Sequence, residues 1–187
     1  MSKSAVIITA IAALLALIAG FIAVRGPLPA NLELRRSARL HHPAKVVWPV
    51  ILDIESWAGW RTDLTSLTRE GEVRGHAVWR ETRPGESVAL ETVEVLKDRR
   101  LVRCVHGADA PFGGCITVEM LAREDMCIVS YIEGLRLDNA IFRFTHTIQG
   151  RRHHIDEWLT ALAAKFGDVP ELANEIKELT LKKKAAE

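Results

Sequence analysis

Residues 32–48 read LELRRSARLHHPAKVVW, and this stretch decides the fold because one proline separates a strand pattern from a helix pattern. Before Pro43, leucines at positions 32, 34 and 40 alternate with charged residues, which predicts a first strand over 32–41 with one face toward water. After Pro43, apolar residues recur at spacings of three and four, which predicts a short amphipathic helix. Pro49 lies inside this helix and is expected to kink it or delay its start, and a second helical turn is predicted over 53–59.

Six more strands are predicted between residues 64 and 137, because apolar and β-branched runs there are separated by short clusters of turn residues. Connections this short allow only antiparallel neighbours, so the strands should form a meander. The predicted strands are Leu64–Glu70, Ala77–Thr82, Ser87–Leu96, Leu101–His106, Cys115–Ala122 and Met126–Leu137.

One long helix is predicted after the last strand. Asp138 or Asn139 provides an N-cap, and apolar residues then fall on one stripe of a helix of about 27 residues that ends near Phe166. Gly150, in the middle of this helix, is its expected bend, and Gly167 resembles a C-terminal stop.

The N-terminal segment Ala5–Val24 holds 18 hydrophobic residues out of 20 and no charge. A helix of this length spans about 30 Å, the thickness of the hydrocarbon core of a bilayer, so the segment is predicted to be a membrane anchor. A cleaved signal peptide is the alternative, but Leu17 and Phe21 put bulky side chains where its cleavage site needs small ones. The chain therefore divides into an anchor (1–25), a linker (26–31), a folded domain (32–167) and a helical basic tail (168–187).

Positive charges near the anchor indicate on which side of the membrane the domain lies. Arg25, Arg35, Arg36 and Arg39 follow the apolar segment and favour a cytoplasmic domain, whereas Lys3, on the short N-terminal side, favours the opposite orientation. We expect a single-pass membrane protein whose domain is cytoplasmic.

The composition excludes several classes of protein. Of 187 residues, 48% are hydrophobic and 26% charged, with 25 basic and 24 acidic side chains, which excludes a disordered chain and a strongly basic nucleic-acid binder. Three cysteines without CxxC spacing predict free thiols that pack in the core. The pairs His41-His42 and His153-His154 point in different directions, so we predict no metal site and no cofactor. The sequence does not indicate an oligomeric state.

The order of these elements resembles the SRPBCC (START/Bet v 1-like) superfamily, and within it the polyketide cyclase/dehydrase-like group, which includes members with one N-terminal span. The resemblance covers residues 32–167. It implies the helix-grip fold, an α+β fold in which a curved antiparallel sheet of about seven strands surrounds a long C-terminal helix, with two short helices after the first strand. The residues that carry it are Ser37–Trp48, Asp53, Trp57, Trp60, Pro111–Gly114, Glu133-Gly134 and Ile141–Phe144.

A strongly curved sheet around one helix leaves a cavity along its concave face, and such cavities are largely apolar with a few polar groups. We therefore expect a small hydrophobic ligand, such as a lipid, a quinone or a polyketide-like compound, taken from the adjacent bilayer. The cavity candidates are Trp57, Trp60, Trp79, Glu81, Glu119, Tyr131, Glu133 and Phe142. For each tryptophan the alternative is core packing, and for most of the glutamates it is a position facing water. Arg80 and Arg103 could neutralise a buried carboxylate on a neighbouring strand, but the solvated outer face is the favoured position for both.

Two other functions are compatible with this pattern. A cyclase or dehydratase would use a buried cavity side chain with a polar partner as its acid or base, from among Glu81, Glu91, Glu119, Glu133 and Tyr131. A non-catalytic interaction module would have no cavity and an exposed apolar patch instead. A hollow filled by side chains would count against ligand binding.

Overall fold

The computed structural model describes residues 7, 11–14, 16, 17, 20, 30–107, 110, 112–137 and 152–174. The domain begins with strand β1 (Asn31–Leu40), helix α2 (Ala44–Leu52) and a 3-10 helix, η1 (Ile54–Gly59). Pro43 stands at the N-cap of α2, so Pro49 does not delay the start of this helix. The meander then follows as β2 (Ser66–Val73), β3 (His76–Arg83), β4 (Glu86–Leu96), β5 (Arg100–Val105), β6 (Gly113–Ala122) and β7 (Cys127–Arg136), and the described chain ends with α4 (Arg152–Lys165) and β8 (Glu171–Ala173).

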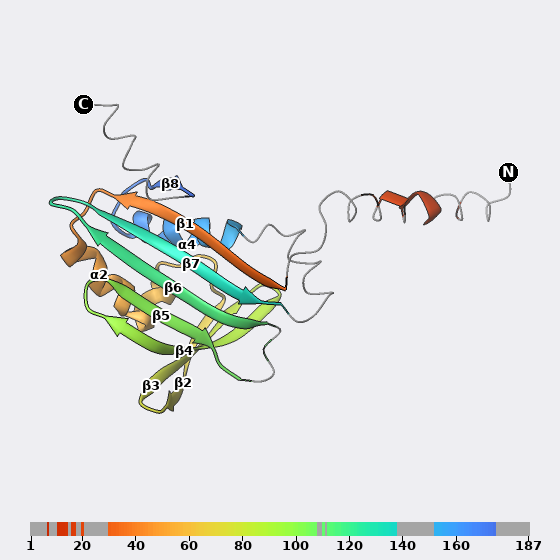
Figure 1. Ribbon diagram of the computed structural model, residues 1–187, viewed down its shortest axis with the longest axis horizontal. Helices are drawn as coiled ribbons and strands as arrows, with labels where there is room; N and C mark the ends of the chain where they lie inside the picture. The colour runs from red at the N-terminus through yellow and green to blue at the C-terminus, as the bar shows by residue number, and fades with distance from the viewer. Residues whose placement is uncertain are drawn as a thin grey trace.

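In the part of the chain that the structure describes, eight strands form one antiparallel sheet in the order β2-β3-β4-β5-β6-β7-β1-β8. The register shifts between Arg69 and Gly71 in β2 and between Thr92 and Glu94 in β4, and such bulges bend a sheet. Figure 1 shows the resulting curved sheet, with α2 and α4 on the same side of it. The α+β helix-grip architecture predicted from the sequence is confirmed.

The core lies between the concave face of the sheet and the three helical elements. Alternate residues of β1 and β7, among them Ala38, Leu40 and Val129, pack against Val47 of α2 and Leu159 of α4. An ion pair also fixes α4 to β1, because Nε of Arg36 donates a hydrogen bond of 2.7 Å to Asp156. The period of two in the strands and the apolar stripe of α4 therefore meet on one face.

The C-terminal region differs from the prediction at residues 171–173. A helix was expected there, but β8 pairs with residues Ser37–Arg39 of β1. The edge of β1 presents unpaired backbone groups, and a passing extended segment satisfies them. Arg39 adds a salt bridge of 3.1 Å to Glu171. The sheet, as far as the described residues form it, consequently has eight strands rather than about seven.

Only the second half of the predicted long helix falls on described residues, as α4. Gly167 follows it with φ of +70°, a left-handed conformation that fits the predicted C-terminal stop. Residues 138–151, which include Phe142 and Gly150, lie outside the described residues, as does the lysine run of the tail.

The predicted anchor also lies largely outside the described residues. Among the residues that are described, no helix is long and apolar enough to cross a membrane.

The prediction of free thiols is wrong for two of the three cysteines. Cys104 of β5 and Cys115 of β6 form a disulfide, while Cys127 is free and buried. The two bonded cysteines are eleven residues apart, which resembles no cysteine motif, but the hairpin register places them directly opposite each other. This disulfide can therefore be predicted only when the pairing of β5 with β6 is known.

Candidate ligand pocket

Four aromatic residues fill the centre of the hollow between the sheet and α4. The ring of Trp158 in α4 lies 5.9 Å from the rings of both Trp57 and Trp60, and 5.1 Å from that of Tyr131 in β7. All four side chains are at least nine-tenths buried. Trp57 and Trp60 are therefore core residues, the alternative that the sequence left open, and this part of the predicted cavity is occupied by the protein itself.

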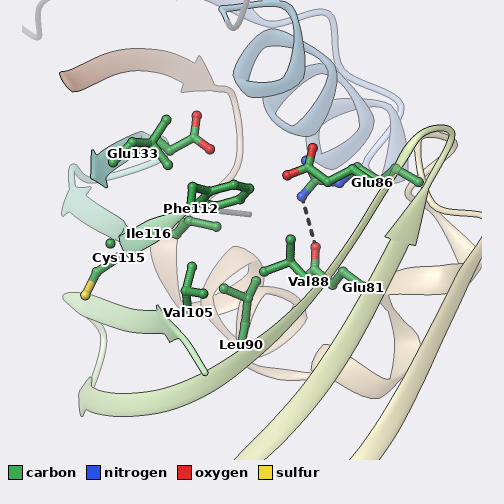
Figure 2. A pocket seen from close by; sticks show the side chains of 12 residues that line it. Glu81, Glu86, Val88, Leu90, Val105, Phe112, Cys115, Ile116 and Glu133 are labelled. Carbon is green, nitrogen blue, oxygen red and sulfur yellow. Dashed lines mark hydrogen bonds and ion pairs between the residues drawn. The ribbon is translucent and has the colours of Figure 1, made fainter. Parts of the chain in front are cut away.

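A narrow pocket remains on the concave face, beside this aromatic core, and its free volume of about 20 Å³ is room for about one water molecule. One wall comes from β3, β4 and the end of β5, and the other from the start of β6 and from β7 (Figure 2). The pocket is lined by Glu81, Arg83, Glu86, Val88, Leu90, Val105, Phe112, Gly114, Cys115, Ile116, Glu133 and Leu135.

The body of the pocket is apolar because the inward positions of four strands carry aliphatic side chains there. Val88, Leu90, Phe112 and Leu135 belong to one buried cluster. Within the second wall, β6 lies close to β7 at Gly114, which has φ of +123°. A Cβ atom at this position would collide with the carbonyl oxygen of Gly134. Only glycine allows the two strands to approach in this way.

A buried ion network forms the polar end of the pocket. The carboxylate of Glu81 in β3 accepts hydrogen bonds from Arg61 at 2.7 Å, from Arg83 at 3.2 Å and from Arg103. Asp63 pairs in turn with Arg61 at 2.6 Å and with Arg83 at 3.4 Å. Three positive and two negative charges therefore lie together where water is largely excluded.

This network fixes the charge state of its members. Burial opposes ionisation of Glu81, but the charges of Arg61, Arg103 and Arg83 outweigh it and hold the pKa of Glu81 far below its usual value of 4.5. Burial opposes ionisation of Asp63 as well, but its hydrogen bond to Arg61 outweighs this effect and keeps the pKa of Asp63 below its usual value. Glu81 is thus a permanent anion at neutral pH, and this excludes it as a general acid or base.

Arg103 connects the ion network to the aromatic core. Its guanidinium carbon lies 4.9 Å from the centre of the Trp57 ring. Nε and Nη2 of Arg103 are buried and have no hydrogen-bond partner among the described residues, so the ring face takes the place of polar partners for them. Arg103 therefore neutralises a buried carboxylate, whereas Arg80 pairs with Glu70 on the exposed side of the sheet, the position that the sequence favoured for both arginines.

Glu133 is the second of the candidate carboxylates that lines the pocket. It lies on β7, is 5% exposed and lines the pocket. Figure 2 shows its carboxylate across the Phe112 ring from Val105 and Leu90. Burial raises the pKa of the neighbouring Tyr131, and the charge of Glu133 raises it further, so Tyr131 is a neutral phenol at physiological pH.

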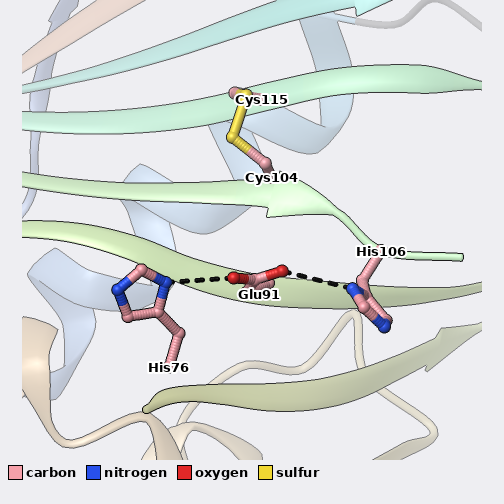
Figure 3. Close-up of a disulfide and its surroundings, with 5 residues drawn as sticks. All are labelled: His76, Glu91, Cys104, His106 and Cys115. Carbon is pink, nitrogen blue, oxygen red and sulfur yellow. Dashed lines mark hydrogen bonds and ion pairs between the residues drawn. A yellow bond between two sulfur atoms is a disulfide. The ribbon is translucent and has the colours of Figure 1, made fainter. Parts of the chain in front are cut away.

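The other predicted residues lie elsewhere. Glu119 is on the convex face of the sheet, because the residues before and after it in β6 point into the core on the concave face. Its carboxylate lies 3.5 Å from Nη2 of Arg35. Glu91 is also on the convex face, between Nδ1 of His76 at 3.0 Å and Nδ1 of His106 at 3.2 Å, near the disulfide (Figure 3). Trp79 is half-buried and lines a separate surface groove, and Phe142 lies outside the described residues.

No metal centre is present in the described part of the chain, since its His, Cys, Asp and Glu side chains form no group of three that could hold an ion.

Sequence reasoning missed Arg61, Asp63 and Arg83. Arg61 and Asp63 sit in a loop after η1, where charged residues usually face water. Glu81 and Arg83 are two residues apart on one strand, so their side chains point to the same face of the sheet. The sequence does not say whether that face is the inner or the outer one. Phe112 was missed for a similar reason, because its inward direction depends on how the chain enters β6.

Comparisons with known proteins support the fold. Neither a protein-family model nor a curated protein sequence matches the chain. Among solved structures, the Zhui aromatase/cyclase from Streptomyces sp. R1128 has a TM-score of 0.57 at 12% identity and covers 72% of this chain and 93% of its own. A START superfamily protein from Mycobacterium smegmatis has a TM-score of 0.56 at 10% identity, with coverages of 71% and 95%. Truncated norcoclaurine synthase from Thalictrum flavum has a TM-score of 0.59 at 11% identity, with coverages of 71% and 91%.

These values show that the chain shares the fold of these structures, a curved antiparallel sheet with a C-terminal helix against it. At such low identity the likeness shows the fold alone, and no activity follows from it.

Proposed function

We propose that this chain is a binding protein for a compact molecule that has a largely apolar body and one polar group. The observation that carries this proposal is the pocket itself, which has an aliphatic and aromatic body and charged groups at defined positions. Pockets for small ligands have this composition, in which apolar walls provide affinity and few polar groups fix orientation. The resemblance in sequence and the likeness in fold together support a place in the SRPBCC superfamily.

The size of the pocket restricts the ligand. Its free space is about 20 Å³, which is room for about one water molecule, so a ligand enters only if the lining side chains move aside. The aromatic core occupies the space that a two-chain lipid would need. Among the expected ligands, a polyketide-like compound or the ring of a quinone therefore requires less movement of the lining side chains than a phospholipid.

The N-terminal apolar segment would hold the domain at a membrane. Tethering raises the concentration of a sparingly soluble ligand around the pocket, because such ligands accumulate in the bilayer. The Cys104–Cys115 disulfide favours a domain on the oxidising side of that membrane, since disulfides are rare in the cytosol. We therefore propose this orientation in place of the cytoplasmic one.

Ligand extraction tests the binding proposal. The full chain is purified in mild detergent, extracted with organic solvent and analysed by mass spectrometry, in parallel with Val105→Phe and Val95→Phe. Val105 lines the pocket, whereas Val95 is 48% exposed outside it, so the two variants add the same bulk inside and outside. We expect one enriched compound from wild type and V95F and its loss from V105F. Equal extracts from all three, or none from wild type, would refute the proposal.

A second function rests on Glu133. This carboxyl lies in an apolar pocket and could transfer a proton to or from a bound molecule, as in a cyclase or dehydratase. Two of the similar structures are enzymes by name, an aromatase/cyclase and a synthase. Incubation of the extracted compound with wild type and Glu133→Gln separates the two functions. An enzyme converts the compound and E133Q binds it unchanged, whereas a binding protein returns it intact from both.

A further inference from the structure

The pocket lies at the point where the pairing between β5 and β6 ends. The last pair of that ladder is Cys104 with Cys115, and the next residues toward the pocket, Val105 and Gly114, both line it. Beyond this pair, β5 continues with β4 and β6 continues with β7, so the two walls belong to separate strand pairs. The disulfide joins the walls where they begin to separate.

The two faces of the sheet divide the structure at this point. Val105, Gly114 and Cys115 all line the pocket, but the sulfur of Cys115 points away from the other lining side chains, toward the convex face (Figure 2). Figure 3 shows the disulfide there, on strands β5 and β6. Both cysteines are only partly buried, so a thiol in solution reaches the bond without entering the pocket.

The position of Phe112 in the second wall depends on the disulfide. It is 8% exposed and precedes Cys115 by three residues, in a buried cluster with Val88 and Leu90 of the opposite wall. A small shift of β6 relative to β5 therefore moves Phe112 against the aliphatic side chains of β4 and changes the width of the pocket.

We propose that the Cys104–Cys115 disulfide is a redox-sensitive clasp on the pocket, which fixes the separation of its walls so that the oxidised chain binds ligand more tightly than the reduced chain. This proposal rests on the proposed function, since it concerns regulation of the same site. The clasp opens by thiol–disulfide exchange with a dithiol. One thiolate of the dithiol attacks a sulfur of the bond, its second thiol then closes the dithiol's own disulfide, and Cys104 and Cys115 are left as two thiols.

Linkage makes the effect reciprocal. If oxidation raises ligand affinity by a given factor, then bound ligand raises the equilibrium constant for disulfide formation by the same factor. A ligand-loaded pocket should therefore resist reduction, and this consequence distinguishes a clasp on the pocket from a bond that only stabilises the fold.

Amide hydrogen exchange tests the mechanical part without any ligand. Wild type in detergent is compared with wild type treated with dithiothreitol, with Cys104→Ser/Cys115→Ser and with Cys127→Ala, which removes a cysteine but leaves the disulfide intact. Reduction and the double substitution should each accelerate exchange of residues 112–116 by about tenfold while leaving α4 unchanged. C127A should respond to dithiothreitol as wild type does. Unchanged exchange at 112–116 in both disulfide-free forms would overturn the proposal.

Binding of the amphipathic dye anilinonaphthalene sulfonate tests the control of the pocket. We expect affinity about tenfold weaker for the reduced chain, with slower reduction when the dye is present. Equal affinity of both redox forms, despite faster exchange at 112–116, would overturn the proposal. Failure of the oxidised chain to bind the dye or any extracted compound would instead refute the proposed function, because the exchange result is obtained independently.

Discussion

Three guanidinium groups surround one carboxylate at the polar end of the pocket, and this arrangement makes Glu81 sensitive to substitution. A buried ion pair contributes little compared with a well-packed apolar pair, because both ions lose their hydration. Removing one partner is a different matter, since the remaining charges stay buried without compensation. Glu81 is the shared partner of Arg61, Arg83 and Arg103, so its loss affects all three.

Glu81→Gln is expected to lower the free energy of unfolding by about 3–5 kcal/mol at neutral pH. Because the folded state depresses the pKa of Glu81, its stabilisation is complete above the usual value of 4.5 and is lost as pH falls below it. The difference between wild type and E81Q should therefore shrink in urea titrations at progressively lower pH below 4.5. Glu119→Gln is the control, because an exposed pair contributes at most about 1 kcal/mol. A difference that grew on acidification would contradict this account.

Gly114→Ala tests the close approach of β6 and β7. The added methyl group would collide with the carbonyl oxygen of Gly134, and φ of +123° is unfavourable for alanine. We expect the free energy of unfolding to fall by at least about 2 kcal/mol, as measured by thermal or urea unfolding. Gly75→Ala provides the comparison, since Gly75 also has positive φ, +82°, but open space around it. It should cost only about 1 kcal/mol. Equal losses would show that strain, and not the contact with Gly134, decides the residue type.

At the scale of elements, Trp158 is the largest fully buried side chain of α4. Trp158 contacts aromatic rings from η1, from the segment that follows it and from β7. Trp158→Ala should therefore cost about 3–5 kcal/mol, because the cavity it leaves cannot be filled by rigid neighbouring rings. Circular dichroism during urea titration measures the effect. Thr160→Ala, at an exposed position of the same helix, should change stability by less than about 0.5 kcal/mol. A loss of similar size in both variants would contradict this role of Trp158.

The sequence predicted most elements because their signals are local. Turn residues such as Pro84-Gly85 delimit the strands, and Pro43 delimits α2, whatever the rest of the chain does. It did not predict β8, whose three residues are extended only because the edge of β1 lies beside them. The inward or outward direction of Glu119 and Glu133 was equally inaccessible, since one residue of register reverses it.

At the scale of the whole molecule, the disulfide bears on where the domain resides. In cells that produce the full chain, an impermeant maleimide should label Cys104 and Cys115 only after treatment with an impermeant reductant. Cys127 serves as an internal control, because burial raises the pKa of its thiol to about 12 and keeps it unreactive. Labelling that requires cell lysis but no reductant would place the domain in the cytosol and contradict the proposed orientation.

The two outermost strands of the described sheet, β2 and β8, have a consequence for behaviour at high concentration. Exposed edge strands are where β proteins aggregate, because their free N–H and C=O groups pair with other chains. Here one edge is only three residues long, and the other carries Arg69, Glu70 and Glu72 beside a bulge. Neither offers a flat template of useful length. A domain held at high local concentration is thereby protected from polymerising with its neighbours.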